Sequence, residues 1–192
     1  MQSQSWKKKR SVINHYDKLV KVYDSLYTDE QNQKIECILR IVRVAQTDYL
    51  LDVGCGTGLL FNHIDCVNGF YIGVEISSGL LRTAVNRIKQ LSAISCAFII
   101  RADADYLPFK NEVIDKIFAL TLLQNMPHPS VTLKEMMRIA KDNSTIVVTG
   151  LKKTFTKERF RSMLRKADLK YYILRPQCKI QDLIAICHKK QK

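Results

Sequence analysis

The sequence predicts an α/β fold: a doubly wound, mostly parallel seven-stranded sheet with helices on both faces, a C-terminal antiparallel hairpin, and helices ahead of the first strand. Three observations support this prediction. Apolar segments of strand length alternate with helical segments from residue 49 onward, as in strands joined by helical crossovers. A glycine-rich segment follows the first of these strands. A short turn-like connection separates the last two apolar segments, so those two strands can pair antiparallel.

Each predicted element follows from its residues. Residues 11–45 have helical periodicity with a break near 27–30. The later apolar segments predict strands at 49–53, 70–75, 96–101, 114–120, 144–149, 170–174 and 182–187. Helices are expected at 57–65, 78–91, 130–140 and 156–167. Residues 1–10 are expected to form a flexible basic arm, and residues 11–192 a single domain, because a chain of this length can bury a full hydrophobic core.

The segment at residues 50–60 is the most informative part of the chain. Its sequence, L-L-D-V-G-C-G-T-G-L-L, passes from an apolar strand through three alternate glycines into an apolar helix. Glycine removes the β-carbons that would keep a ligand from the backbone, and it permits the positive φ angles of a tight turn. The spacing G-x-G-x-G differs from the G-x-G-x-x-G of dinucleotide-binding folds, and no Gly-Lys-Ser/Thr follows to make a phosphate-binding P-loop.

Further motifs follow in a fixed order. A second apolar strand ends in Glu75, 23 residues after Asp52, and an acid there can accept hydrogen bonds from both ribose hydroxyls of a nucleoside. The motifs are D-V-G-C-G-T-G, G-V-E-I-S, A-D-A-D-Y-L-P-F and I-D-K-I-F-A-L-T-L-L-Q-N-M-P-H-P. With them the chain resembles the class I (Rossmann-like) S-adenosylmethionine-dependent methyltransferases of the small single-domain type. The resemblance covers about residues 12 to 187.

The resemblance implies S-adenosylmethionine as the cofactor and S-adenosylhomocysteine as the product. It implies that Asp52 approaches the amino group of the cofactor and that Glu75 holds the ribose. Asp103 would accept a hydrogen bond from the adenine amine, and Tyr16 lies in a segment that resembles the family's entry helix over the methionine end. The complete expected cofactor-binding set is Tyr16, Asp52, Gly54, Cys55, Gly56, Gly58, Glu75, Ile76, Asp103, Ala104 and Leu120.

The candidate catalytic residues are Asn125, His128 and Tyr23. Residues 125–128 resemble the N-x-P-aromatic signature of methyltransferases that act on exocyclic amines, but Asn125 lies ten residues past Asp115 instead of four or five. A turn ended by proline is the alternative. His128 could act as a base near neutral pH. Tyr23 shares a helical face with Tyr16, and simple packing of the two rings is the alternative. No cysteine lies close after the end of the fourth or fifth strand, which argues against pyrimidine C5 methylation through a covalent adduct.

The chain is strongly basic, with 31 Lys and Arg against 18 Asp and Glu and a net charge of +13. Phosphate backbones favour such a surplus through counterion release, so we expect the substrate to be a base in ribosomal or transfer RNA. Three alternatives stay open: a solvated basic surface, a small-molecule or protein substrate, and a catalytically silent cofactor-binding subunit. The expected RNA-binding residues are Lys7, Lys8, Lys9, Arg10, Lys152, Lys153 and Arg159.

Other sequence features bear on the redox state, location and partners of the protein. Its six cysteines have no C-x-x-C spacing, which favours reduced thiols over a disulfide framework or a metal site. No apolar stretch approaches the ~20 residues of a membrane span, and no apolar region follows the basic N-terminal run as it would in a secretory signal. We expect a cytoplasmic monomer or weak dimer, with RNA or a ribonucleoprotein and a small activating protein as candidate partners.

Overall fold

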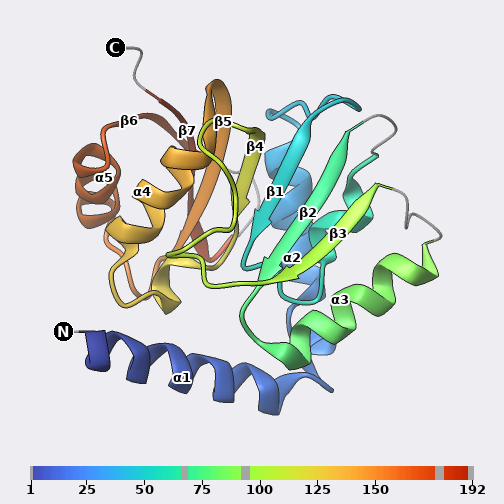
Figure 1. Ribbon diagram of the computed structural model, residues 1–192. Coiled ribbons are helices and arrows are strands. Elements are labelled where there is room, and N and C mark those ends of the chain that lie inside the picture. The colour runs from blue at the N-terminus through green and yellow to red at the C-terminus, as the bar shows by residue number, and fades with distance from the viewer. Residues whose placement is uncertain (1, 66–68, 92–95, 176–179, 190–192) are drawn as a thin grey trace.

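The computed structural model describes residues 2–65, 69–91, 96–175 and 180–189. One mixed sheet runs through them in the order β3-β2-β1-β4-β5-β7-β6 (Figure 1). Pairs from β3 to β5 are parallel, whereas β7 is antiparallel to both β5 and β6. The predicted fold class is confirmed. The strands are β1 (Tyr49–Val53), β2 (Phe70–Glu75), β3 (Ala97–Arg101), β4 (Ile114–Ala119), β5 (Ala140–Leu151), β6 (Leu169–Leu174) and β7 (Asp182–Lys189).

Helices cover both faces of the sheet. The α-helices are α1 (Gln2–Leu19), α2 (Tyr23–Leu39), α3 (Ser78–Gln90), α4 (Pro129–Ile139) and α5 (Lys157–Lys166). Successive strand residues point to opposite faces, so Leu50 packs with Ile38 of α2 while Leu51 belongs to the cluster that contains Leu133 of α4 and Phe160 of α5. Because each face has its own apolar cover, the central parallel strands are buried on both sides.

The N-terminal segment differs from the prediction. Residues 1–10 were expected as a flexible arm, but the helix α1 begins at Gln2 and crosses the end of the sheet (Figure 1). Its residue Lys9 is only 8% exposed, and the Lys9 ammonium donates to Asp103 and Asp105 in the loop between β3 and β4. These contacts order the basic run, which is therefore part of a packed helix.

Smaller differences have local causes. The break between the N-terminal helices lies at residues 20–22, ahead of the expected 27–30. The expected helix at 57–65 is a short 3-10 helix, η1 (Leu59–His63), and it begins only after Gly58, because the left-handed φ of 79° at Gly58 cannot belong to a right-handed helix. Strand β5 begins at Ala140, earlier than expected, because that residue pairs with Ile114 of β4.

The described part of the chain has neither a membrane-spanning helix nor a candidate metal-binding cluster. None of its helices has the length and apolar character needed to cross a membrane. Likewise, no group of three or more His, Cys, Asp or Glu side chains in the described ranges could hold a metal ion.

Candidate cofactor and substrate site

The glycine loop after β1 turns with three left-handed residues. Gly54, Gly56 and Gly58 have φ angles of 75°, 58° and 79°, which glycine adopts without the steric cost that other residues incur. The Gly54 amide donates to the Val74 carbonyl at 2.7 Å, which holds the loop against the end of β2. A β-carbon on Gly54 would lie 2.9 Å from Leu122 Cδ1, and one on Gly56 would face the Tyr23 hydroxyl at 3.5 Å. At Gly54 and Gly56, backbone without a side chain therefore faces the space next to the loop.

Glu75 ties this loop to the end of β2. Its Oε2 accepts from the Gly56 amide at 3.1 Å, and its Oε1 accepts from the amides of Ile76 and Ser77, both at 2.8 Å. Burial raises the pKa of Glu75, and the hydrogen bonds from Ser77, Gly56 and Ile76 oppose that rise. A carboxylate has about four acceptor positions, so the three amides leave about one for a ligand, where both ribose hydroxyls were expected.

A cavity opens between the glycine loop and α1, and most of the predicted cofactor residues line it. The predicted residues in its wall are Tyr16, Tyr23, Gly54, Gly56, Glu75, Ile76, Asp103, Ala104, Leu120 and Asn125. The wall also contains residues that the sequence analysis did not assign to the site: Lys9, Val12, Ile13, Val74, Ser77, Leu80, Ala102, Thr121, Leu122 and Met126. Val12, Ile13 and Tyr16 lie at helical spacing in α1, and this spacing is the signal that could have placed the helix over the site.

Four predicted residues lie outside this wall. Asp52 and Cys55 line a neighbouring smaller cavity, which also includes Gly54 and Tyr23. Gly58 packs against α3, where its β-carbon would lie 3.3 Å from that of Ala84. His128 is exposed at the start of α4 and does not line the cavity, so it is not placed to act as a base there.

Asp52 is buried beside the glycine loop and accepts a hydrogen bond from the Tyr71 hydroxyl at 2.7 Å. Burial raises the pKa of Asp52 to about 7, although the Tyr71 hydrogen bond opposes the rise and the charge of Glu75 adds to it. A cationic ligand beside Asp52 would favour the ionised carboxylate.

At the other end of the cavity, Asp103 is bound to Lys9. The Lys9 Nζ lies 2.8 Å and 2.7 Å from the two Asp103 oxygens and 2.5 Å from Asp105 Oδ2. The neighbouring Lys8 Nζ donates to the Met126 carbonyl at 2.9 Å. The expectation that Lys9 contacts RNA phosphates is therefore wrong, because its ammonium is buried between two carboxylates.

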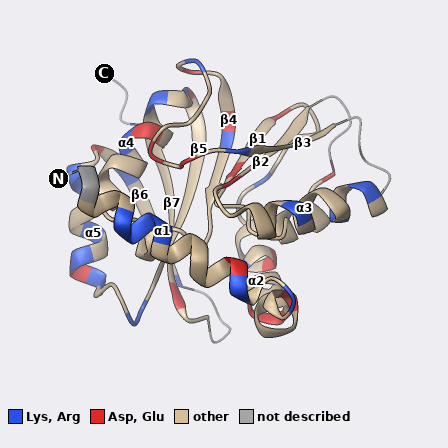
Figure 2. Ribbon diagram, turned by 60° about the horizontal axis from the view of Figure 1, so that its bottom comes forward, with Lys and Arg blue, Asp and Glu red and all other residues tan. Residues whose placement is uncertain are grey.

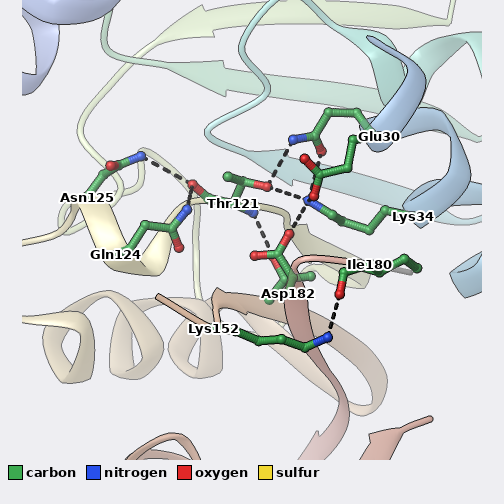
Figure 3. Close-up of polar contacts among 10 residues, drawn as sticks. Glu30, Lys34, Thr121, Gln124, Asn125, Lys152, Ile180 and Asp182 are labelled. Carbon is green, nitrogen blue, oxygen red and sulfur yellow. Dashed lines mark hydrogen bonds and ion pairs between the residues drawn. The ribbon is translucent and has the colours of Figure 1, made fainter. Parts of the chain in front are cut away.

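Thr121, two residues after the end of β4, is the centre of a polar network (Figure 3). It has a φ of 57°, and its amide donates to Thr149 Oγ1 at 2.7 Å. Its carbonyl accepts from Gln124 at 2.7 Å and from Asn125 at 3.2 Å. Asn125 also donates to the Tyr16 hydroxyl at 2.9 Å. The network thus fixes the side chains that face the cavity beyond β4.

The two tyrosines in this region are not bases. Burial raises the pKa of Tyr16, although the hydrogen bond from Asn125 opposes the rise. Burial also raises the pKa of Tyr23, and the negative charge of Glu75 adds to the effect. Both phenols therefore stay protonated at neutral pH and can donate hydrogen bonds.

A buried lysine completes the network from α2. Lys34 is fully buried, forms an ion pair with Asp182 at the start of β7, and donates to Thr121 Oγ1 at 2.9 Å (Figure 3). Gln31 donates to the same oxygen at 3.1 Å. Lys34 therefore joins α2, the end of β4 and β7 through one charged group.

Comparison with known proteins agrees with this geometry. The family model described as a methyltransferase domain matches residues 51–148, slightly more than half of the chain. The chain belongs to this family. S-adenosylmethionine is the cofactor that the family membership implies, and the resemblance to small class I methyltransferases is confirmed.

Two curated relatives show how far the similarity extends. The uncharacterized protein MJ1252 of Methanocaldococcus jannaschii is 29% identical over 143 residues, which are 74% of this chain and 53% of that protein. Malonyl-[acyl-carrier protein] O-methyltransferase of a Marinomonas species is 28% identical over 145 residues, 74% of this chain and 52% of that one. This methyltransferase-domain chain thus spans about half the length of the curated relatives it matches.

Two solved structures share the fold. A Methanococcus maripaludis protein named as an S-adenosyl-L-methionine-dependent methyltransferase has a TM-score of 0.78 at 14% identity, covering 94% of both chains. The methyltransferase chain of a Haloferax volcanii complex with the Trm112 methyltransferase activator has a TM-score of 0.76 at 16% identity, covering 92% of this chain and 98% of that one.

The glycine loop generates a first prediction. We expect Gly56→Val to abolish measurable cofactor binding, because its side chain would enter the cavity wall and its left-handed backbone would cost about 1–2 kcal/mol. Gly58→Val is a matched control, since it has similar backbone strain but faces Ala84 outside the cavity. Calorimetric titration with S-adenosylhomocysteine measures both. Retained binding by a folded Gly56→Val variant would contradict the assignment of the loop.

The buried ion pair generates a second prediction. Lys34→Met should lower the free energy of unfolding by about 3–5 kcal/mol, because Asp182 would keep a buried charge without its partner. Adding Asp182→Leu should recover most of the loss. Lys141→Met, which breaks a partly exposed pair with Asp115, should cost less than about 1 kcal/mol. Urea unfolding gives all three values, and a Lys34→Met cost no larger than the Lys141→Met cost would contradict the prediction.

Proposed function

We propose that the chain is an S-adenosylmethionine-dependent methyltransferase that uses the cavity between the glycine loop and α1. The observation that carries the proposal is the convergence on one cavity of the glycine loop, the Glu75 carboxylate and the Asp103 carboxylate. When bound, the cofactor supplies a methyl group activated by a positively charged sulfur. In our proposal, Glu75 accepts from the ribose, Asp103 accepts from the adenine amine, and Asp52 stabilises the amino group of the cofactor. Ile76 and Ala104 would pack against the adenine.

The substrate end of the proposed site lies beyond β4. Methyl transfer needs in-line alignment of donor and acceptor more than it needs a protein nucleophile. The Asn125 amide nitrogen donates to the Tyr16 hydroxyl and to the Thr121 carbonyl, which leaves its side-chain oxygen to accept a hydrogen bond. In our proposal, Asn125 orients a donor group of the substrate, and Tyr23 contributes a hydroxyl donor.

We propose RNA as the substrate because basic side chains gather near this end of the sheet. Figure 2 shows Lys and Arg along α5. A surface cavity between α5 and β6 has five cationic residues in its wall: Lys152, Lys157, Arg161, Arg165 and Arg175. Asp182 lines the same cavity and forms the ion pair with Lys34, which in turn contacts Thr121 in the wall of the cofactor cavity. A polyanion bound at α5 would therefore lie next to the substrate end.

A small-molecule substrate is the second candidate. One curated relative is named as a malonyl-[acyl-carrier protein] O-methyltransferase. The cavity wall is also rich in apolar side chains such as Leu120, Leu122 and Met126, which suit a compact organic acceptor. This candidate predicts no strong dependence of activity or binding on salt.

We also propose that the chain works with a small protein activator. The support is the Haloferax volcanii structure, in which a chain of the same fold is in complex with the Trm112 activator. Methyl-transfer assays should therefore be run both with the chain alone and with a candidate activator added.

The basic surface generates the test between RNA and a small molecule. We expect the logarithm of the RNA affinity to fall with the logarithm of salt by about 0.7–0.9 for each phosphate neutralised. The triple variant Lys157→Ala, Arg161→Ala, Arg165→Ala should weaken RNA binding. It should also reduce the slope by the contribution of about two to three phosphate contacts. Filter binding of transfer RNA and ribosomal RNA over a salt series measures the slope.

The control for this test removes the same number of positive charges from a different surface. Lys18, Arg82 and Lys89 are exposed residues of α1 and α3, and their replacement by Ala should leave the slope nearly unchanged. A flat wild-type line, together with label transfer from the cofactor to a metabolite extract, would replace the RNA proposal by the small-molecule one.

A further inference from the structure

The side chain of Lys9 uses its whole donor capacity on two carboxylates. A lysine ammonium carries three N–H donors. Three acceptor atoms surround the Lys9 Nζ, namely Asp103 Oδ1 at 2.8 Å, Asp103 Oδ2 at 2.7 Å and Asp105 Oδ2 at 2.5 Å. Lys9 therefore lines the cofactor cavity without a proton to offer a ligand, and it acts on the cavity only through Asp103.

Other groups fix the two carboxylates as well. The Asp105 amide donates to Asp103 Oδ1 at 3.0 Å, and the hydroxyl of Thr132, which is buried in α4, donates to Asp105 Oδ1 at 2.5 Å. Burial lowers the pKa of Lys9, but the hydrogen bonds and charges of Asp103 and Asp105 outweigh this and raise it above its ordinary value. The cluster thus holds one permanent positive charge against two carboxylates, and its remaining charge is negative.

Counting acceptor positions identifies the atom that is left for a ligand. Each carboxylate oxygen has about two lone-pair positions. On Asp103, Oδ1 already accepts from Lys9 and from the Asp105 amide, while Oδ2 accepts from Lys9 alone. One position on Oδ2 remains, in a net negative cluster that favours a hydrogen-bond donor over an acceptor.

We propose that Lys9 is a positioning residue for adenine recognition: it holds Asp103 so that Oδ2 accepts from the 6-amino group of the cofactor. The inference rests on the proposed function, in which Asp103 accepts from that amine. It also links base recognition to the closure of α1, because the helix that carries Lys9 supplies Val12, Ile13 and Tyr16 to the cavity wall.

The test compares two ligands that differ only at the 6 position. S-adenosylhomocysteine carries the amino donor, and its analogue with unsubstituted purine in place of adenine carries only a hydrogen at that position. The wild-type chain should prefer the adenosyl ligand by about 100-fold or more, because the analogue would cover the Asp103 Oδ2 acceptor without giving it a donor. Lys9→Met should reduce this preference by about tenfold, mostly by weakening S-adenosylhomocysteine, because Asp103 loses the group that fixes it. Lys9→Arg, which keeps the charge, should retain most of the preference.

Lys7→Met is the matched control, since Lys7 is an exposed lysine of the same helix, and it should leave both affinities within about twofold of wild type. Titration calorimetry gives the affinities, and circular dichroism confirms that each variant is folded. Equal weakening of both ligands in Lys9→Met would show a merely structural role and overturn the proposal. Tighter binding of both ligands would overturn it too, because Lys9 would then compete with the cofactor.

Asp103→Ala, which removes the acceptor, separates this inference from the proposed function. If Asp103→Ala keeps the full preference for the adenosyl ligand, the assignment of Asp103 to adenine is wrong, and the inference about Lys9 falls with it. If Asp103→Ala loses the preference while Lys9→Met keeps it, the assignment of Asp103 stands and only the role of Lys9 is overturned.

Discussion

The geometry of the site depends on the carboxylate of Glu75. Three backbone amides, one from the glycine loop and two from the residues after β2, donate to this one group. One of the donors, Ser77, also caps α3 through its side chain, which accepts from the Leu80 amide at 3.2 Å. The loop, the strand end and the helix start are therefore fixed together. Because Glu75 is only 7% exposed, its ionised form is costly to bury unless these three amides donate to it.

The helix α1 closes the cavity through polar contacts near its middle and near its C-terminal end. Asp17 accepts from the Ser77 hydroxyl at 2.5 Å and from the Gly79 amide at 3.1 Å. Lys9 contacts Asp103 about two helical turns earlier. Between these contacts, Val12, Ile13 and Tyr16 line the cavity. Lys34 has a corresponding role on the substrate side, where it links Thr121 to β7. Charged side chains therefore fix the positions of α1, α2 and β7, which the hydrogen bonds between the parallel strands do not determine.

The sequence was sufficient wherever the cause of the structure is local. The succession of strands along the chain, the glycine loop and the position of Glu75 follow from apolar runs, turn chemistry and spacing. The role of Lys9 does not, because its partner Asp103 lies 94 residues away and a K-K-K-R run has the composition of a solvated arm. Thr121 was missed for the same reason, since its donor Lys34 is 87 residues away. Spacing alone placed Gly58 in the cofactor site. Successive residues of a tight turn face different sides of the chain, however, and Gly58 faces Ala84 of α3.

A crystal structure of the chain with S-adenosylhomocysteine tests the central claim most directly. We predict that the product lies in the cavity between the glycine loop and α1. The ribose should be next to Glu75, and the 6-amino group should be within hydrogen-bond distance of Asp103 while Lys9 keeps its contacts. A product bound outside this cavity would contradict the account. So would a complex in which α1 has left the sheet and Lys9 no longer contacts Asp103.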